Sequence, residues 1–79
     1  MTPDVTHVKI QPNFELIVTF ADGARKLFLM LPYLQYPAFR PLSEPGKFDL
    51  AHVSNGTVEW TDEIDISPDT LYIAGHPAS

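Results

Sequence analysis

The 79-residue chain contains no cysteine, so it can form neither a disulfide nor a thiolate metal site. It also lacks a long apolar run, because the longest, Leu27–Leu31, is far too short to span a bilayer. The N-terminus does not show the charged-then-apolar order of a signal peptide. We therefore expect no membrane association and one cytoplasmic domain over residues 1–79, with its core at about 5–74 and a loose tail at 75–79.

Basic residues are scarce as well, with five Lys and Arg against ten Asp and Glu and a net charge of −5. The only adjacent basic pair is Arg25-Lys26. An acidic chain without a basic cluster is repelled by phosphate backbones, so we predict no direct contact with nucleic acid. A DNA-associated regulator is the weaker alternative, and it would have to act through a partner.

Motifs for catalysis and cofactor binding are absent too. Ser43, Ser54 and Ser67 lie outside any G-x-S-x-G elbow, and no glycine lies in a phosphate-binding string. The histidines His7, His52 and His76 have no metal-ligand spacing. We predict no catalytic residue, no cofactor and no metal site.

Two carboxylate-rich places leave an alternative open, a small enzyme or ligand-binding domain. One pairs His52 with Asp49, and the other is the acidic segment Asp62–Asp65. Paired carboxylates perform acid–base chemistry when their surroundings separate their pKa values. A run of acidic residues beside turn signals is more often a solvated loop, which could meet a basic partner surface.

What the sequence does contain is a clear β-hairpin over Phe14–Leu31. Apolar residues occupy every second position from Phe14 to Phe20, and Asp22-Gly23 reverses the chain. Ala24–Leu31 returns as the next strand. Val5–Gln11 precedes the hairpin as another strand, with two alternating faces. Thr6, Val8 and Ile10 form one of these faces, and Val5, His7 and Lys9 form the other.

The alternation does not fix the register of this hairpin. A two-residue turn places Leu27, Leu29 and Leu31 on the core face of Leu16. A type I turn with a bulge at Gly23 shifts the pairing by one residue and sets Phe28 opposite Leu16 instead. A shift of one residue moves every side chain to the other face. We favour the bulge, because it puts Phe28 in the core.

The rest of the chain indicates an α+β fold. Prolines limit the middle to single helical turns, and Asn55-Gly56 predicts a second hairpin. Ser67 is placed to cap a helix that begins at Pro68 and ends at Gly75. We predict one small antiparallel sheet of about five strands with two hairpins, short helical turns and one short C-terminal helix. The expected elements are turns at Pro32–Leu34, Ala38–Leu42 and Pro45–Phe48, strands at Leu50–Ser54, Thr57–Trp60 and Ile64–Ile66, and a helix at Ser67–Ala74.

The order of several short motifs resembles the bacterial domain of unknown function 2442 family. The resemblance covers about Val5 to Tyr72 and rests on the spacing of these strings as a set. They are Val18-Thr19-Phe20-Ala21-Asp22-Gly23, Lys26-x-Phe28, Pro32-x-Leu34, Phe39-x-x-Leu42, Pro45-x-x-Phe48, Asn55-Gly56-Thr57-Val58-x-Trp60 and Ser67-Pro68-Asp69-Thr70-Leu71-Tyr72.

The resemblance implies a small α+β protein without established catalytic residues. Some members of the family are fused to helix-turn-helix domains, for which this chain has no room. Others are encoded beside a small protein of the domain of unknown function 4160 family, an arrangement resembling a toxin–antitoxin pair. The family usually has polar residues where this chain has Leu29 and Leu31.

These observations favour a non-enzymatic protein-interaction or regulatory module, with an antitoxin-like role as one form of it. Its partner would be another protein, such as a family 4160 neighbour, or a second copy of the chain. Most aromatic rings should be core in so small a domain, with a subset near Tyr33, Tyr36 and Phe39 as the alternative anchor. The predicted interface residues are Ile17, Leu27, Leu29, Leu31, Tyr33 and Tyr36.

Overall fold

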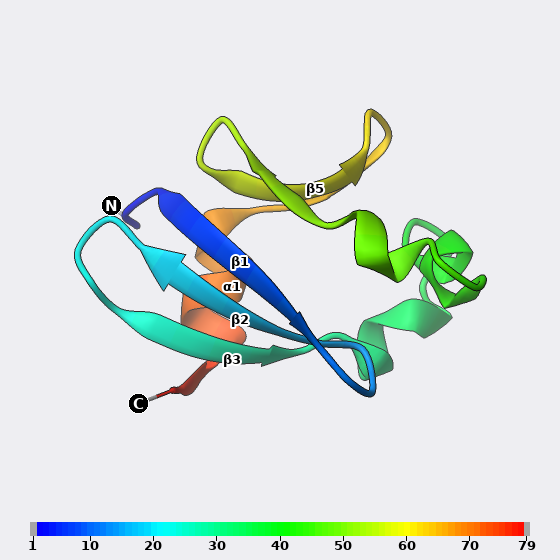
Figure 1. Cartoon of the computed structure of the whole chain (residues 1–79), viewed down its shortest axis with the longest axis horizontal. Coiled ribbons are helices and arrows are strands. Elements are labelled where there is room, and N and C mark those ends of the chain that lie inside the picture. The colour runs from blue at the N-terminus through cyan, green and yellow to red at the C-terminus, as the bar shows by residue number, and fades with distance from the viewer. Residues whose placement is uncertain (1, 79) are drawn as a thin grey trace.

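The computed structural model describes residues 2–78 and arranges their strands in two antiparallel sheets. The larger sheet has the order β1-β2-β3-β7 and the smaller one β4-β5-β6 (Figure 1). The fold is α+β, as predicted, but the strands form two sheets in place of one. The strands are β1 (Val5–Gln11), β2 (Glu15–Phe20), β3 (Arg25–Leu29), β4 (His52–Ser54), β5 (Thr57–Thr61), β6 (Ile64–Ile66) and β7 (His76–Pro77).

The first hairpin adopts the bulged register that we favoured. Leu16 lies opposite Phe28, and both side chains are buried. The Gly23 amide donates to the Phe20 carbonyl over 2.9 Å, and the Phe20 amide donates to the Ala24 carbonyl over 2.9 Å. This pattern is a type I turn followed by a bulge, with Gly23 at φ +89°. Odd-numbered residues of β3 therefore point away from the core.

The faces predicted for β1 are correct from His7 onward and wrong at its start. The pairing with β2 shifts between Val5 and His7, so one extra residue, Thr6, interrupts the alternation. As a result Val5 is buried with Val8 on the core side, and Thr6 is exposed. A bulge of this kind leaves no signal in a simple period-two pattern.

Strand β2 begins one residue later than the alternation predicts. Phe14 lies in the turn with φ +60°, next to Asn13 with φ +65°. Left-handed backbone is unfavourable for a bulky residue. The Phe14 ring packs edge-on against Phe48 with the centroids 5.2 Å apart, and its carbonyl accepts from the Met30 amide over 2.9 Å. These two contacts are what hold the residue in this conformation.

Three 3-10 helices connect the sheets, close to the predicted helical turns. They are η1 (Leu31–Gln35), η2 (Arg40–Ser43) and η3 (Phe48–Leu50). Prolines recur through η1 and η2 and keep these two short. Leu42 and Phe48 anchor it in the core. The indole of the buried Trp60 donates to the Phe48 carbonyl over 3.1 Å, which ties the segment to the smaller sheet.

Helix α1 (Pro68–Ala74) lies behind the larger sheet, on its core side (Figure 1). The Ser67 hydroxyl accepts from the Thr70 amide over 3.2 Å, which confirms the predicted cap. Leu71 is fully buried, and Tyr72 packs edge-on against Phe20. Both sheets and α1 therefore contribute to one core. Its buried members are Val5, Leu16, Val18, Phe20, Phe28, Met30, Leu42, Phe48, Val58, Trp60, Ile66 and Leu71.

The loose tail predicted from residue 75 is wrong for residues 76–77. His76 pairs with Leu27 and Pro77 with Lys26, which makes β7 a short edge strand of the larger sheet. The Ala78 amide also donates to the Arg25 carbonyl over 3.0 Å. Backbone hydrogen bonds, which side-chain pattern does not reveal, hold this segment. Ser79 lies outside the described residues.

Candidate interaction surface

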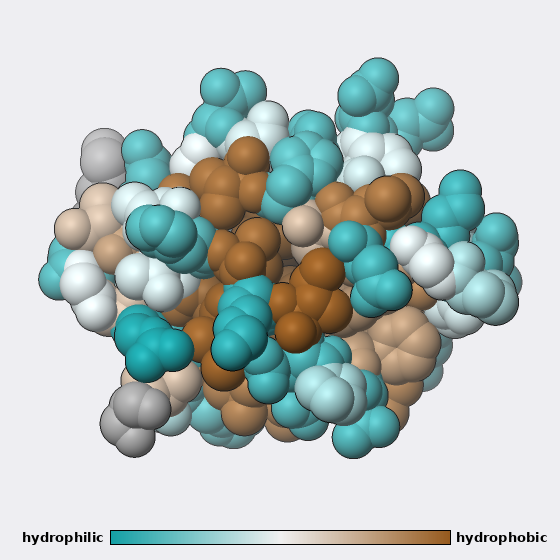
Figure 2. Space-filling model, viewed as in Figure 1, coloured by the Kyte–Doolittle hydropathy of each residue, from teal (hydrophilic) through white to brown (hydrophobic). Residues whose placement is uncertain are grey.

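The face of the larger sheet that turns away from α1 carries apolar side chains from neighbouring strands. Ile17 and Leu27 lie opposite each other on β2 and β3, and Leu29 follows two residues later on β3. None of the three belongs to the buried core. We call this side of β1, β2, β3 and β7 the outer face. Figure 2 looks onto it and shows apolar side chains gathered over the middle of the sheet, among hydrophilic ones.

Exposed apolar residues continue from the outer face into the first 3-10 helix. Leu29 is 38% exposed, Leu31 is 57% exposed and Tyr36 is 52% exposed. Tyr33 is half-buried, with its ring 5.1 Å from that of Phe28 and 6.1 Å from that of Tyr36. The six residues predicted as an interface thus lie on the outer face of β2 and β3 and in or beside η1. Phe39 is half-buried and packs against the core.

Positive charge borders the apolar part of the outer face. Lys9 lies opposite Ile17, and Arg25 lies two residues before Leu27. His7 lies opposite Thr19, and the carboxylate on these paired rows is Glu15. The outer face is therefore apolar with a mainly basic border, although the chain as a whole is acidic.

A groove opens where β3 ends and η1 begins. Its volume is about 350 Å³. Phe28 and Leu29 form one wall, and the rings of Tyr33 and Tyr36 form another. The lining is completed by Pro32, Gln35, Ala74 and His76. The side-chain pattern of the sequence does not reveal this groove, because its lining brings Ala74 and His76 beside Leu29.

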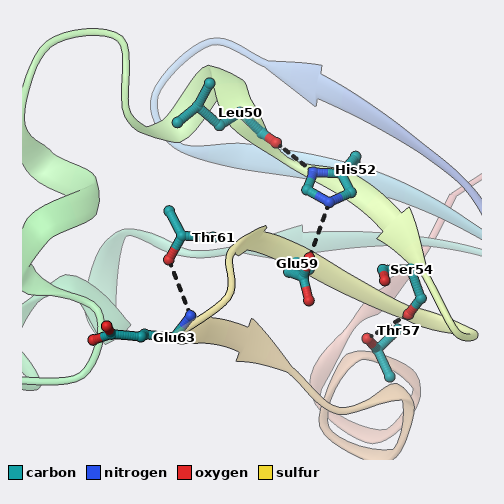
Figure 3. Close-up of polar contacts among 7 residues, drawn as sticks. All are labelled: Leu50, His52, Ser54, Thr57, Glu59, Thr61 and Glu63. Atoms are coloured by element: carbon teal, nitrogen blue, oxygen red, sulfur yellow. Dashed lines mark hydrogen bonds and ion pairs between the residues drawn. The ribbon is translucent and has the colours of Figure 1, made fainter.

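His52 on the smaller sheet contacts two acceptors at once (Figure 3). Its Nδ1 lies 2.8 Å from the Leu50 carbonyl, and its Nε2 lies 3.2 Å from Glu59 Oε2. Only the protonated ring can donate to both. The hydrogen bond to the Leu50 carbonyl is the largest cause of a pKa of His52 raised above its ordinary value of 6.5; desolvation opposes it, and the Glu59 carboxylate adds to the rise.

The two carboxylate-rich places are not assembled into a shared site. Within residues 2–78, the side-chain partner of His52 is Glu59, and no hydrogen bond joins it to Asp49. Asp62 and Glu63 are exposed in the turn before β6, where the Glu63 amide donates to the Thr61 hydroxyl (Figure 3), and Asp65 is exposed within β6. Among the described residues, no group of three or more His, Asp or Glu side chains could hold a metal ion.

Charge is distributed unequally along the chain, a signal that the net charge alone conceals. Residues 1–47 carry five Lys or Arg and four Asp or Glu. Residues 48–79 carry no Lys or Arg and six Asp or Glu. On the smaller sheet, Glu59 and Asp65 lie side by side on the face opposite the buried Val58 and Ile66. The two sheets therefore present surfaces of different charge.

A comparison with protein families matches residues 5–77 to a family described as protein of unknown function (DUF2442). The chain belongs to the DUF2442 family. This confirms the resemblance drawn from the motifs. No curated protein and no solved structure matches the chain. Among residues 2–78 of this DUF2442 protein, no helix combines the length and the apolar character that a membrane crossing requires.

Proposed function

We propose that this DUF2442 protein is a non-enzymatic protein-interaction module that binds its partner through the outer face and η1. One observation carries the proposal, the register that places Ile17, Leu27 and Leu29 on the side away from the core. Exposed apolar side chains that gather on one surface are typical of sites that another protein covers. Leu31 and Tyr36 extend this surface into η1.

The composition of the surface suits a specific protein partner. Tyrosines with large rings and few rotatable bonds are common anchors at interfaces, and Tyr33 and Tyr36 lie beside Leu29 around one groove. The basic border formed by Lys9 and Arg25 would set orientation more than affinity. A regulatory role, such as that of an antitoxin-like member of a pair, would use the surface to cover a partner protein.

Co-purification with a candidate partner tests the proposal. The first candidate is a small protein of the domain of unknown function 4160 family, the neighbour that the family resemblance implies for some members. We expect a stable complex on a sizing column with light scattering, or self-association of the chain alone. The double variant Leu29→Thr/Leu31→Ser should weaken it by at least about tenfold, since truncated anchors commonly cost that much.

A matched control separates interface loss from general loss of apolar surface. Ile73 is 81% exposed on α1, on the other side of the sheet. Ile73→Ser should leave the complex unchanged. A strictly monomeric protein that binds no neighbouring gene product, or a complex equally weakened by Ile73→Ser, would overturn the proposed function.

A further inference from the structure

The free edge of β3 is only partly covered. Strand β7 pairs with Lys26 and Leu27, and the Ala78 amide donates to the Arg25 carbonyl. Among residues 2–78, no strand pairs with this edge beyond Leu27. The edge has therefore already accepted one extended segment, and its other end is open.

Leu29 presents its backbone polar groups to that open end. The Phe20 amide donates to the Ala24 carbonyl, and the Met30 amide donates to the Phe14 carbonyl. Because hydrogen-bonding directions alternate along an antiparallel strand, Ala24, Lys26, Phe28 and Met30 face β2. Leu29 consequently directs its N–H and C=O away from β2. An unpaired edge of this kind is a template for an added strand.

The groove begins at this point of the edge. It is lined by Leu29 and His76 together with Phe28, Tyr33 and Tyr36. A strand added beside Leu29 would continue the line of β7, and one of its side chains would enter between the tyrosines. Backbone hydrogen bonds and a side-chain pocket are thus adjacent, the combination by which sheet edges recognise extended peptides.

The charges around the groove favour a carboxylate in the incoming segment. The lining includes no Asp, Glu, Lys or Arg among the described residues. The Arg40 guanidinium donates a hydrogen bond over 3.1 Å to the backbone carbonyl of Gln35, one of the lining residues. A basic segment would meet the like charge of Arg40 beside the groove, and an acidic one would meet opposite charge.

A second copy of the chain fits this edge poorly through its own β3. Its own β3 could offer only residues 28–30, because β7 covers Lys26 and Leu27 and η1 begins at Leu31. A free extended segment has no such limit. We infer that the open end of the β3 edge, at Leu29, binds an extended apolar segment bearing carboxylates from a partner protein, as a strand added beyond β7. This inference rests on the proposed function and specifies how the partner is held.

A peptide that reads the same in both directions tests the inference for either strand orientation. The probe is the acetylated, amidated nonapeptide E-S-V-T-F-T-V-S-E, added to ¹⁵N-labelled protein. We expect shifts of the Leu29 amide and slower exchange of its proton. N-methylation of the central phenylalanine and both threonines should abolish binding, because it removes edge donors. The K-S-V-T-F-T-V-S-K peptide should bind at least about threefold more weakly.

Two protein variants locate the site. Leu29→Pro removes the edge donor without breaking a bond to β2, and should weaken the acidic peptide by about tenfold. Tyr36→Ala should also weaken it, whereas Leu50→Ala, with similar exposure at 49% against 52%, should not. Circular dichroism of each variant verifies folding, and Tyr36→Ala tests the site if Leu29→Pro does not fold.

Several outcomes would overturn the inference. They are the absence of peptide binding, equal binding of the N-methylated peptide, insensitivity to Tyr36→Ala, and concentration-dependent shifts of the Leu29 amide without peptide, which would indicate a second copy. Equal or tighter binding of the lysine peptide would overturn its charge requirement. If the peptide does not bind but a partner complex forms and depends on Leu31, this inference is wrong and the proposed function stands. If no partner complex forms at all, both the proposed function and this inference are wrong.

Discussion

The four-stranded and three-stranded sheets carry different side chains on the faces that they turn away from the core. The larger sheet carries the half-buried Ile17 and Leu27 and the exposed Leu29 on this face, with Lys9 and Arg25 beside them. The smaller sheet has His52, Glu59 and Asp65 side by side across its three strands. Both sheets bury apolar residues on their other face. The two sheets share one core but differ on their other faces. The face of the larger sheet is apolar and suited to a partner, whereas that of the smaller sheet is acidic.

The charge of the chain also differs between the part that forms most of the larger sheet and the part that forms the smaller sheet. All of the Lys and Arg residues precede Phe48, and six of the ten Asp and Glu residues follow it. An acidic surface helps to keep a small domain soluble and to repel copies of itself. The larger sheet, with mixed charge and exposed leucines, lacks that protection and would benefit from a covering partner.

The largest expected effect would break the core that the two sheets share. Phe28→Ala removes a buried ring from the larger sheet, at a cost of about 3–5 kcal/mol. Because a domain of this size has a stability on the order of 5 kcal/mol, the variant should be largely unfolded at room temperature. Fluorescence of Trp60 in the smaller sheet and far-ultraviolet circular dichroism should both report the loss.

The neighbouring residue provides the matched control for this prediction. Leu29→Ala, one position along β3 on the outer face, should cost less than about 1 kcal/mol. A folded environment for Trp60 in the Phe28→Ala variant would contradict a shared core. It would mean that the smaller sheet with η3 is stable without the larger one.

A smaller effect compares the turns of the two hairpins. Gly23 has φ +89° and Gly56 has φ +79°, so alanine is strained at both positions, by roughly 1–2 kcal/mol. A Cβ at Gly23 would meet nothing within 4 Å, whereas one at Gly56 would come within 2.7 Å of Asp4 Cγ. Urea unfolding should therefore show a greater loss for Gly56→Ala than for Gly23→Ala. Equal losses would mean that the Asp4 side chain moves away freely.

Local chemistry made most of the fold predictable. Asp22-Gly23 and Asn55-Gly56 mark both hairpins, and Ser67-Pro68 marks the start of α1. What could not be predicted depends on backbone pairing between distant segments. The bulge at Thr6, the division into two sheets and the pairing of β7 with β3 are examples. Side-chain alternation carries little information about any of them.

The candidate surface was predictable only once the register was fixed. Leu27 and Leu29 share a face in either register, but only the bulge at Gly23 puts them on the face of Ile17, away from the core. Phe28 decided the choice, since burying its ring is more favourable than burying a leucine. The groove was not predictable, because its lining brings Leu29 together with Ala74 and His76, which are far away in the sequence.

The smallest expected effect concerns the acidic face of the smaller sheet. Because His52 has a pKa raised above 6.5 in the folded protein, protonation stabilises the fold. This contribution is fully present below pH 6.5 and is lost as the pH rises through the raised pKa of the folded state. The urea midpoint of the natural protein should therefore exceed that of His52→Gln by more at about pH 5.5 than at about pH 8.

A second variant separates the two acceptors that His52 contacts. The hydrogen bond to the Leu50 carbonyl is the largest cause of the raised pKa, and it does not depend on Glu59. In Glu59→Gln, the pKa of His52 measured by NMR titration should fall but stay above 6.5. A return to the ordinary value would assign the effect to the carboxylate alone. A pKa of His52 at or below 6.5 in the natural protein would mean that the ring does not donate to both acceptors in solution. The stability of the natural protein should then depend on pH in the same way as that of His52→Gln.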